Sequence, residues 1–221
     1  MTKSDTTADF FAAIRTGELD QVRSLLDTDG SLASAKNQDG VSAILTSVYS
    51  GRTEIRDLLL AKGASLELQD AVAVGNMERV KEIVGGNPAL AKSFSADGFP
   101  VLALACVFGH LAVAYYLVEN GANIHASATN GTGYNALSGA VAGGHKEIVE
   151  WLLRSGVNAN YKYGAGYTPL LTAAASGRLD LLKLLLTHGS DAAARTNDGK
   201  SALDLARERK QLAVVGFLEN R

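Results

Sequence analysis

The sequence predicts an all-α protein in which short pairs of helices stack side by side in one domain. The first observation is the excess of glycine, with 23 glycines against 3 prolines in 221 residues. Many of these glycines recur in three series that share one register, with most spacings between 33 and 35 residues. The second observation is that apolar residues with helical spacing fill the intervals. A regular period of this length is the signature of a repeat protein.

The glycines divide each unit into a turn and two helices. An aliphatic residue and then small residues follow each glycine of the second series, which predicts a first helix with one tight face. After each glycine of the first series, a run with i, i+3, i+4 spacing, such as Leu181, Leu184 and Leu185, predicts a second, amphipathic helix. That helix ends at a glycine of the third series, because glycine adopts the left-handed conformation that closes a helix. The three series are Gly17, Gly51, Gly75, Gly109, Gly144 and Gly177; Gly40, Gly98, Gly133, Gly166 and Gly199; and Gly63, Gly121, Gly156 and Gly189.

In chain order, the register predicts a disordered tail over residues 1–7 and a single domain over residues 8–221. The third unit is short, because 11 residues separate Gly63 from Gly75 where 20 separate Gly156 from Gly177. The last unit is polar where inner units are aliphatic, as expected of a cap. The expected units are an N-terminal cap (8–36), repeats at about 37–67, 68–94, 95–126, 127–160 and 161–194, and a C-terminal cap (195–221).

Residues 164–189 carry the most complete copy of the unit. They begin Gly-Ala-Gly-Tyr-Thr-Pro-Leu-Leu-Thr-Ala-Ala-Ala-Ser-Gly and end Leu-Leu-Leu-Thr-His-Gly, which resembles the ankyrin-repeat pattern D-x-x-G-x-T-P-L-H-x-A-A-x-x-G-H-x-x-V-V-x-L-L-L-x-x-G-A. The Gly-His pairs at 109–110 and 144–145 match the same pattern. The resemblance covers about seven units over residues 8–221 and implies an ankyrin solenoid of helix-turn-helix units with short β-turn or hairpin fingers. The third unit departs from the family because it lacks its finger.

Composition and charge exclude several classes of partner. With 21 Lys and Arg against 23 Asp and Glu and a net charge of −2, no nucleic-acid partner is expected. The N-terminus lacks the basic start and apolar run of a secretory signal, so we expect a cytoplasmic protein. The uncharged stretch 98–118 is broken by Gly109 and Pro100, so it predicts two short buried helices and no membrane partner. We expect a monomer.

No catalytic, metal or cofactor site is predicted. The four histidines fall on positions of the repeat, and none is paired with a nucleophile or with a ligand at metal spacing. The single cysteine, Cys106, excludes an internal disulfide and aligns with small buried residues, which predicts an unreactive thiol. The glycine-rich segments 131–133 and 164–166 lack the Lys-Ser/Thr ending of a phosphate loop.

Aromatic residues are the most informative candidates for a binding site. The chain has 14 aromatics, and six of them fall on positions that the resemblance places on the concave surface. Exposed aromatics at the centre of a contact surface are the usual source of binding hot spots. An alternative for Phe99 and Phe108 is that they fill space left by the missing third finger. The expected partner-binding residues are Tyr49, Phe99, Phe108, Tyr134, Tyr163 and Tyr167, with Lys200 at the polar edge.

These features predict a non-catalytic protein–protein interaction module, or scaffold, that binds a protein or peptide on a concave, aromatic-lined surface. Tyr134 and Tyr167 are the expected anchors. A second hypothesis is an inhibitor or regulatory subunit that receives a loop of an enzyme in the notch left by the short third unit. A third hypothesis, an enzyme acting on a small molecule in that notch, has no acid–base pair to support it.

Overall fold

The structure is a computed structural model and describes residues 3–220. These residues form α-helices, two 3₁₀ helices (Gly30–Ser34 and Pro88–Lys92) and the turns between them. The α-helices are α1 (Lys3–Thr16), α2 (Leu19–Thr28), α3 (Ala43–Tyr49), α4 (Thr53–Ala61), α5 (Leu68–Ala73), α6 (Met77–Gly86), α7 (Val101–Val107), α8 (Leu111–Glu119), α9 (Ala136–Gly143), α10 (Lys146–Arg154), α11 (Pro169–Ala175), α12 (Leu179–Thr187), α13 (Ala202–Glu208) and α14 (Leu212–Glu219).

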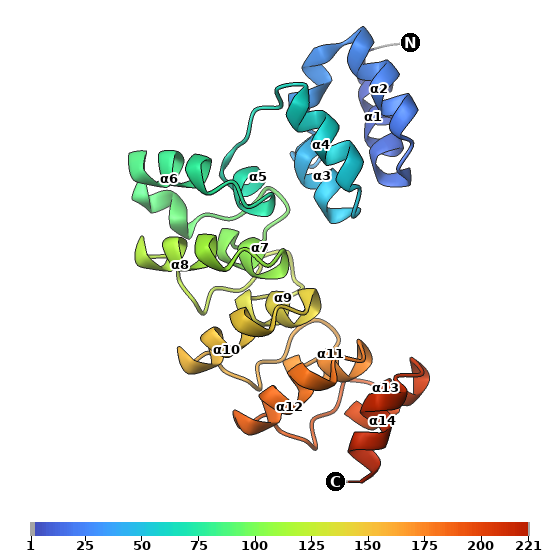
Figure 1. Cartoon of the computed structure of the whole chain (residues 1–221), viewed down its shortest axis with the longest axis vertical. Helices are drawn as coiled ribbons and strands as arrows, with labels where there is room; N and C mark the ends of the chain where they lie inside the picture. The colour runs from blue at the N-terminus through green and yellow to red at the C-terminus, as the bar shows by residue number, and fades with distance from the viewer. Residues whose placement is uncertain (1–2, 221) are drawn as a thin grey trace.

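Consecutive helices pair and the pairs stack in chain order into an elongated solenoid, with the two ends of the chain far apart (Figure 1). The odd-numbered helices from α1 to α13 form an inner row in which each contacts the next, and the even-numbered helices lie outside them. Each of the seven units expected from the sequence contains one helix pair. The prediction of an all-α solenoid of stacked helical pairs is therefore confirmed.

The fingers are short hairpins that precede the inner helices. Each of four fingers is closed by one antiparallel β-bridge, which joins Lys36 to Ser42, Phe94 to Pro100, Ser127 to Asn135, or Tyr163 to Tyr167. Backbone hydrogen bonds join successive fingers, from Thr129 N–H to the Gly98 carbonyl (2.9 Å) and from Gly164 N–H to the Thr132 carbonyl (2.8 Å). Between α4 and α5 only residues 62–67 remain, so the third unit has no finger.

Two features of the sequence set the helix ends and the helix spacing. Gly189 has a φ of +82° after α12, and the next N–H, of Ser190, reaches back to the Leu185 carbonyl at 3.0 Å. Gly139 and Gly143 lie on the face of α9 that meets α7, where a Cβ would stand 3.1 Å from the Ala103 oxygen and 2.2 Å from the Val107 oxygen. Glycine at both positions lets the two inner helices approach closely.

A repeated hydrogen bond joins most neighbouring pairs. The residue after the glycine between two helices reaches back to a carbonyl of the preceding inner helix. His110 Nε2 donates to the Ala73 carbonyl and His145 Nε2 to the Val107 carbonyl, both at 3.0 Å. Arg52 and Arg178 make the same contact in their units. In the third unit Asn76 occupies this position and instead accepts from the N–H of Arg79, capping its own helix α6.

Most of the apolar interior is divided at this third unit into two clusters, and a small third cluster of Val41, Leu45 and Ala73 spans the junction. Buried residues of the first two pairs, from Phe10 to Leu59, form one cluster, here called the N-terminal core. Buried residues from Leu68 to Val214 form a second cluster, the C-terminal core. Figure 1 shows the connection from α4 to α5 as an extended segment between the first two pairs and the rest. The loss of the finger and of the repeated hydrogen bond thus coincides with the division of the core.

Polar contacts cross the junction in place of the finger. The Ser42 hydroxyl donates to the buried carboxyl of Asp70, which also accepts from the Glu67 N–H at 3.1 Å. Lys36 pairs with Glu67 at 2.6 Å. Burial raises the pKa of Asp70, against the effect of the hydrogen bond from Ser42. These contacts hold α5 beside α3 over a short connection.

One boundary differs from expectation. Helix α1 begins at Lys3, so the prediction of a disordered tail is wrong for residues 3–7, while residues 1–2 lie outside the described residues. The helix extends because the buried Phe10, Phe11 and Ile14 anchor the turns that follow.

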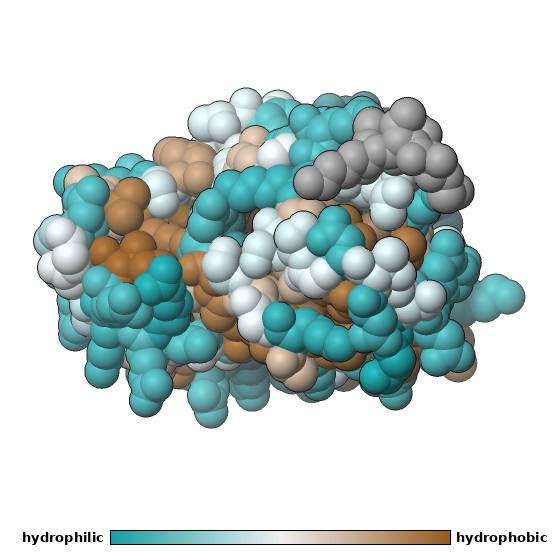
Figure 2. All heavy atoms as spheres, turned by 90° about the horizontal axis from the view of Figure 1, so that it is seen from above, coloured by the Kyte–Doolittle hydropathy of each residue, from teal (hydrophilic) through white to brown (hydrophobic). Residues whose placement is uncertain are grey.

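The surface is polar over most of one end of the molecule. In the view from above (Figure 2), hydrophilic side chains cover most of the visible face, and hydrophobic atoms gather in recesses and in one patch at the left edge. Among residues 3–220 no helix has the length and apolar character needed to cross a membrane.

Candidate functional site

Five of the predicted aromatic residues form a continuous row of ring contacts. The ring centroids of Phe108 and Tyr49 lie 6.1 Å apart, those of Tyr49 and Phe99 6.4 Å, those of Phe99 and Tyr134 6.3 Å, and those of Tyr134 and Tyr163 5.0 Å. Tyr49 ends α3, Phe108 follows α7, and the other three belong to fingers. We call this set the aromatic row.

The row crosses the position of the missing finger. Tyr49 comes from the second helix pair and Phe99 from the finger of the fourth, and their rings meet because no finger stands between them. Phe99 and Phe108 also pack against the C-terminal core. These two residues can therefore fill the space left by the third finger and also belong to a binding surface, so the two hypotheses are compatible.

The residues of the row differ in exposure. Tyr49 is 41% exposed, and Phe99, Phe108 and Tyr134 are half-buried. Tyr163 is only 6% exposed, because its ring lies against Tyr134 and its hydroxyl bonds to that of Thr172. Burial raises the pKa of the Tyr163 hydroxyl. The expectation of an exposed ring at Tyr163 is wrong, and this residue supports Tyr134 from behind.

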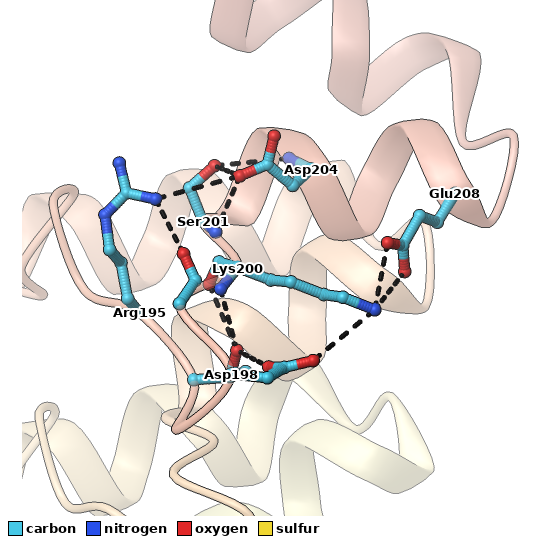
Figure 3. A network of polar contacts seen from close by, with 8 residues as sticks. Arg195, Asp198, Lys200, Ser201, Asp204 and Glu208 are labelled. Atoms are coloured by element: carbon cyan, nitrogen blue, oxygen red, sulfur yellow. Dashed lines mark hydrogen bonds and ion pairs between the residues drawn. The ribbon is translucent and has the colours of Figure 1, made fainter.

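The two remaining candidates lie outside the ring contacts of the row. Tyr167 is half-buried, bridges to Tyr163 through the backbone and packs against the C-terminal core. Lys200 Nζ lies 2.9 Å from Glu208 and 3.5 Å from Asp198, between these two carboxylates in the polar network drawn in Figure 3. The hydrogen bond to Glu208 is the main cause that raises the pKa of Lys200. Its charge is thus matched within the chain, so Lys200 is not a free cation at the edge of the surface.

An apolar hollow of about 260 Å³, here called the aromatic pocket, opens beside the row. The rings of Tyr49, Phe99, Phe108 and Tyr134 line it. The rest of its lining comes from α7, from α9 and from the residue that caps α9: Ala103, Leu104, Val107, Gly139 and Asn135. Short side chains on these helices leave the hollow open, and a Cβ at Gly139 would approach the Ala103 oxygen to 3.1 Å.

A second hollow, of about 710 Å³, lies between the fingers that flank the missing one, and we call it the fingertip hollow. Asp39 lines it from the finger of the second unit and Asp97 from the finger of the fourth unit. Tyr49 lines both hollows. The two fingertips nearly touch, since a Cβ at Gly40 would lie 3.3 Å from that of Ala96. The notch expected from the sequence is therefore narrowed at its tip and persists as this hollow.

Tyr49 lies near the carboxylate of Asp97. Burial, and after it the negative charge of Asp97, raise the pKa of the Tyr49 hydroxyl. The Ser95 hydroxyl donates to the carboxylate of Asp97. This places a carboxylate beside the one ring that the two hollows share.

Chemistry of other kinds has little support in the site. Among the described residues no group of three His, Cys, Asp or Glu side chains is placed to hold a metal ion. Cys106 is fully buried, and burial raises the pKa of its thiol. The histidines at 110 and 145 are engaged in the hydrogen bonds between neighbouring pairs.

The sequence interpretation missed two parts of the site. Asp39 and Asp97 were not singled out, although each directly precedes a finger glycine and was therefore readable as a fingertip position. Gly139 was also missed, and its signal was a glycine inside a predicted helix, which marks a close approach of backbones.

Comparisons with known proteins agree with this architecture. A family model described as ankyrin repeats (3 copies) matches residues 68–163 and 137–220. Ankyrin repeat and SAM domain-containing protein 6 of Mus musculus is 38% identical over 88 residues, which is 40% of this chain and 10% of the mouse protein. The Rattus norvegicus protein of the same name is 37% identical over 92 residues, 42% of this chain and 10% of its own length. Each match thus spans about a tenth of the relative. The chain belongs to the ankyrin-repeat family.

Proposed function

We propose that this protein is a non-catalytic interaction module that binds a segment of a protein partner on its aromatic row, with the aromatic pocket at the centre. Ankyrin repeats are generally protein–protein interaction modules, and the family is typically non-catalytic. The observation that carries the proposal is an open apolar pocket walled by the four rings of Tyr49, Phe99, Phe108 and Tyr134. We further propose that it acts as a monomer in the cytoplasm.

The geometry supports binding by a preformed surface. The rings hold one another through edge and stacked contacts at 6.1–6.4 Å. Because the side chains are already ordered, little conformational entropy remains to be lost when a partner docks. Aromatic side chains in such central positions each contribute roughly 2 kcal/mol or more when they are hot spots.

The test replaces rings of the row and compares them with a ring elsewhere. Tyr49→Ala and Tyr134→Ala remove two walls of the aromatic pocket. Tyr115→Ala is the matched control, because Tyr115 is 42% exposed on α8 and contacts Trp151 at 4.5 Å. We expect the proteins captured from cell extract by the wild-type chain to be retained by the control and lost from the other two. Circular dichroism verifies that all three variants stay folded.

If the two row variants capture the same proteins as wild type, the row is not the binding surface. Tyr167→Ala belongs in the same comparison, because Tyr167 was an expected anchor and yet makes no ring contact within the row among the described residues. We expect a smaller loss for Tyr167→Ala than for Tyr134→Ala.

A second candidate is an inhibitor or regulatory subunit that receives a loop of an enzyme in the fingertip hollow. The volume of about 710 Å³ at the site of the missing finger favours it. Inserting a finger of ten residues into the 62–67 connection would fill this hollow. Under this candidate function the insertion abolishes inhibition while the helical signal is unchanged; inhibition that survives the insertion rejects it.

A further inference from the structure

We propose that the bound segment carries an arginine or lysine within two residues of a large apolar side chain, with the cation at Asp97 and the apolar group in the aromatic pocket. This inference rests on the proposed function and names the chemistry of the partner. It follows from two observations: the two hollows share the ring of Tyr49, and the carboxylate of Asp97 has no ion-pair partner among the described residues.

The two hollows are neighbours that differ in character. Tyr49 forms a wall of each, so a single ring separates the apolar pocket from the polar fingertip hollow. In an extended segment, side chains two positions apart lie about 7 Å from each other on the same face, which is about the width of a ring and its contacts. The aromatic pocket, at about 260 Å³, is below the roughly 300–1,000 Å³ typical of pockets for whole small molecules, which favours one inserted side chain.

The charges at the fingertips point to a cation. Asp39, Asp97 and Asp198 each precede a finger glycine, so they occupy the same position in their units. In the last finger, Lys200 follows the glycine and pairs with Asp198 at 3.5 Å (Figure 3). In the other two fingers, Val41 and Phe99 follow the glycine and cannot neutralise a carboxylate.

Neither carboxylate of the fingertip hollow takes part in the ion pairs found in the part of the chain that the structure describes. Among the described residues that line this hollow, Arg15 is the one cation, against the two carboxylates of Asp39 and Asp97. Arg15 and Asp39 also line a further hollow together, whereas Asp97 does not. The negative charge available to a partner is therefore mainly that of Asp97.

A basic side chain fits this place in two ways. Its charge gains a charge-assisted hydrogen bond to the Asp97 carboxylate, which the Ser95 hydroxyl holds in position. Its cation also lies close to the ring of Tyr49, where the face of an aromatic ring attracts positive charge. An acidic side chain would be repelled by the like charge of Asp97, so the site favours a basic over an acidic side chain.

The experiment selects short random peptides displayed on phage against the 221-residue chain. We expect the enriched sequences to place Arg or Lys within two positions of Leu, Ile, Met or Phe. An enriched peptide is then synthesised with its basic residue intact and with that residue changed to Gln. Fluorescence anisotropy should show roughly tenfold weaker binding of the Gln peptide, the loss expected for one hydrogen bond to a charged group.

Variants of the chain assign this effect to its residues. Asp97→Asn should remove the difference between the two peptides, and Asp39→Asn should reduce it less. Asp97→Lys should reverse the preference toward a peptide with Glu at the basic position, which tests the charge even if Asp97→Asn alters the finger. Tyr115→Ala is the control that leaves all affinities unchanged.

The outcomes separate this inference from the proposed function. Peptides bound through Tyr49 and Tyr134 without regard to charge, or with a preference for acidic residues, overturn the inference and leave the proposed function standing. Self-association of the chain that Tyr134→Ala abolishes would make a second copy the occupant, and it overturns the inference as well. If no peptide is enriched and the row variants also capture the same proteins as wild type, both proposals fail.

Discussion

Gly143→Ala is predicted to separate α9 from α7 and to destabilise the protein. The new Cβ would stand 2.2 Å from the Val107 carbonyl oxygen, where ordinary contact begins near 3.4 Å. Relief requires a displacement of about 1 Å, because the Val107 oxygen is backbone and cannot rotate away, and the Cβ would also stand 2.5 Å from the ring of His145. The same carbonyl accepts the hydrogen bond from His145 Nε2 at 3.0 Å, so the displacement breaks that bond too.

The size of the effect follows from three contributions. Overpacking of this kind costs roughly 1–3 kcal/mol, and the lost hydrogen bond about 1 kcal/mol. Alanine regains up to about 1 kcal/mol over glycine in a helix, and less here because Gly143 is the last residue of α9. The free energy of unfolding should therefore fall by about 2 kcal/mol.

The assay is urea unfolding followed by circular dichroism, with Gly85→Ala as the matched control. Gly85 lies in α6, is exposed, and a Cβ there meets no atom within 4 Å. The control should be more stable than wild type by about 0.5–1 kcal/mol, because only helix propensity changes. If Gly143→Ala is as stable as wild type, the argument from close approach of the two helices is refuted.

Three other predictions concern the junction and the hydrogen bonds between units. Ser42→Ala should lower the free energy of unfolding by about 2–4 kcal/mol in urea, because it removes the cap of α3 and a hydrogen bond to the buried Asp70. Ser201→Ala removes the cap of α13 and a hydrogen bond to Asp204 at a partly buried site, so it should cost only about 1 kcal/mol; equal losses would contradict the role of burial. Burial lowers the pKa of His110 from its usual value of 6.5, so near and below that pH the unfolded chain binds more protons than the folded one. The free energy of unfolding should therefore decrease as the pH is lowered, and the decrease in the urea midpoint from about pH 7.5 to 5.5 should be smaller in His110→Gln. In amide hydrogen exchange, Leu117→Ala should lower protection in the C-terminal core and leave the N-terminal core unchanged, whereas a uniform loss would show that the two cores unfold as one.

Much of the fold could be predicted because its signals are local. Helix ends depend on glycines such as Gly189, whose backbone conformation few other residues adopt, and the helix faces depend on apolar spacing within about ten residues. Both signals lie within short contiguous segments of the sequence. The short third unit was equally readable, as a count of residues between Gly63 and Gly75.

The site was predicted in part. Tyr49, Phe99, Phe108 and Tyr134 were expected on one surface, and the structure brings their rings around one pocket. The expectations for Tyr163, as an exposed ring, and for Lys200, as a free cation, were wrong. Whether a ring is buried, or a cation already paired, depends on side chains such as Thr172 and Glu208, which the repeat register does not position.

The repeat, the helix pairs, the missing finger and the set of aromatic positions could all be predicted from the amino-acid sequence, because each depends on residues close in the chain. The effect of the missing finger became visible only in the folded molecule. The missing finger lets Tyr49 meet Phe99 from a unit 50 residues away, narrows the notch to the fingertip hollow and divides most of the core into two clusters. In the sequence the deletion appears only as a shorter spacing between glycines. The contacts that replace the finger form between side chains of different units, which lie far apart in the chain.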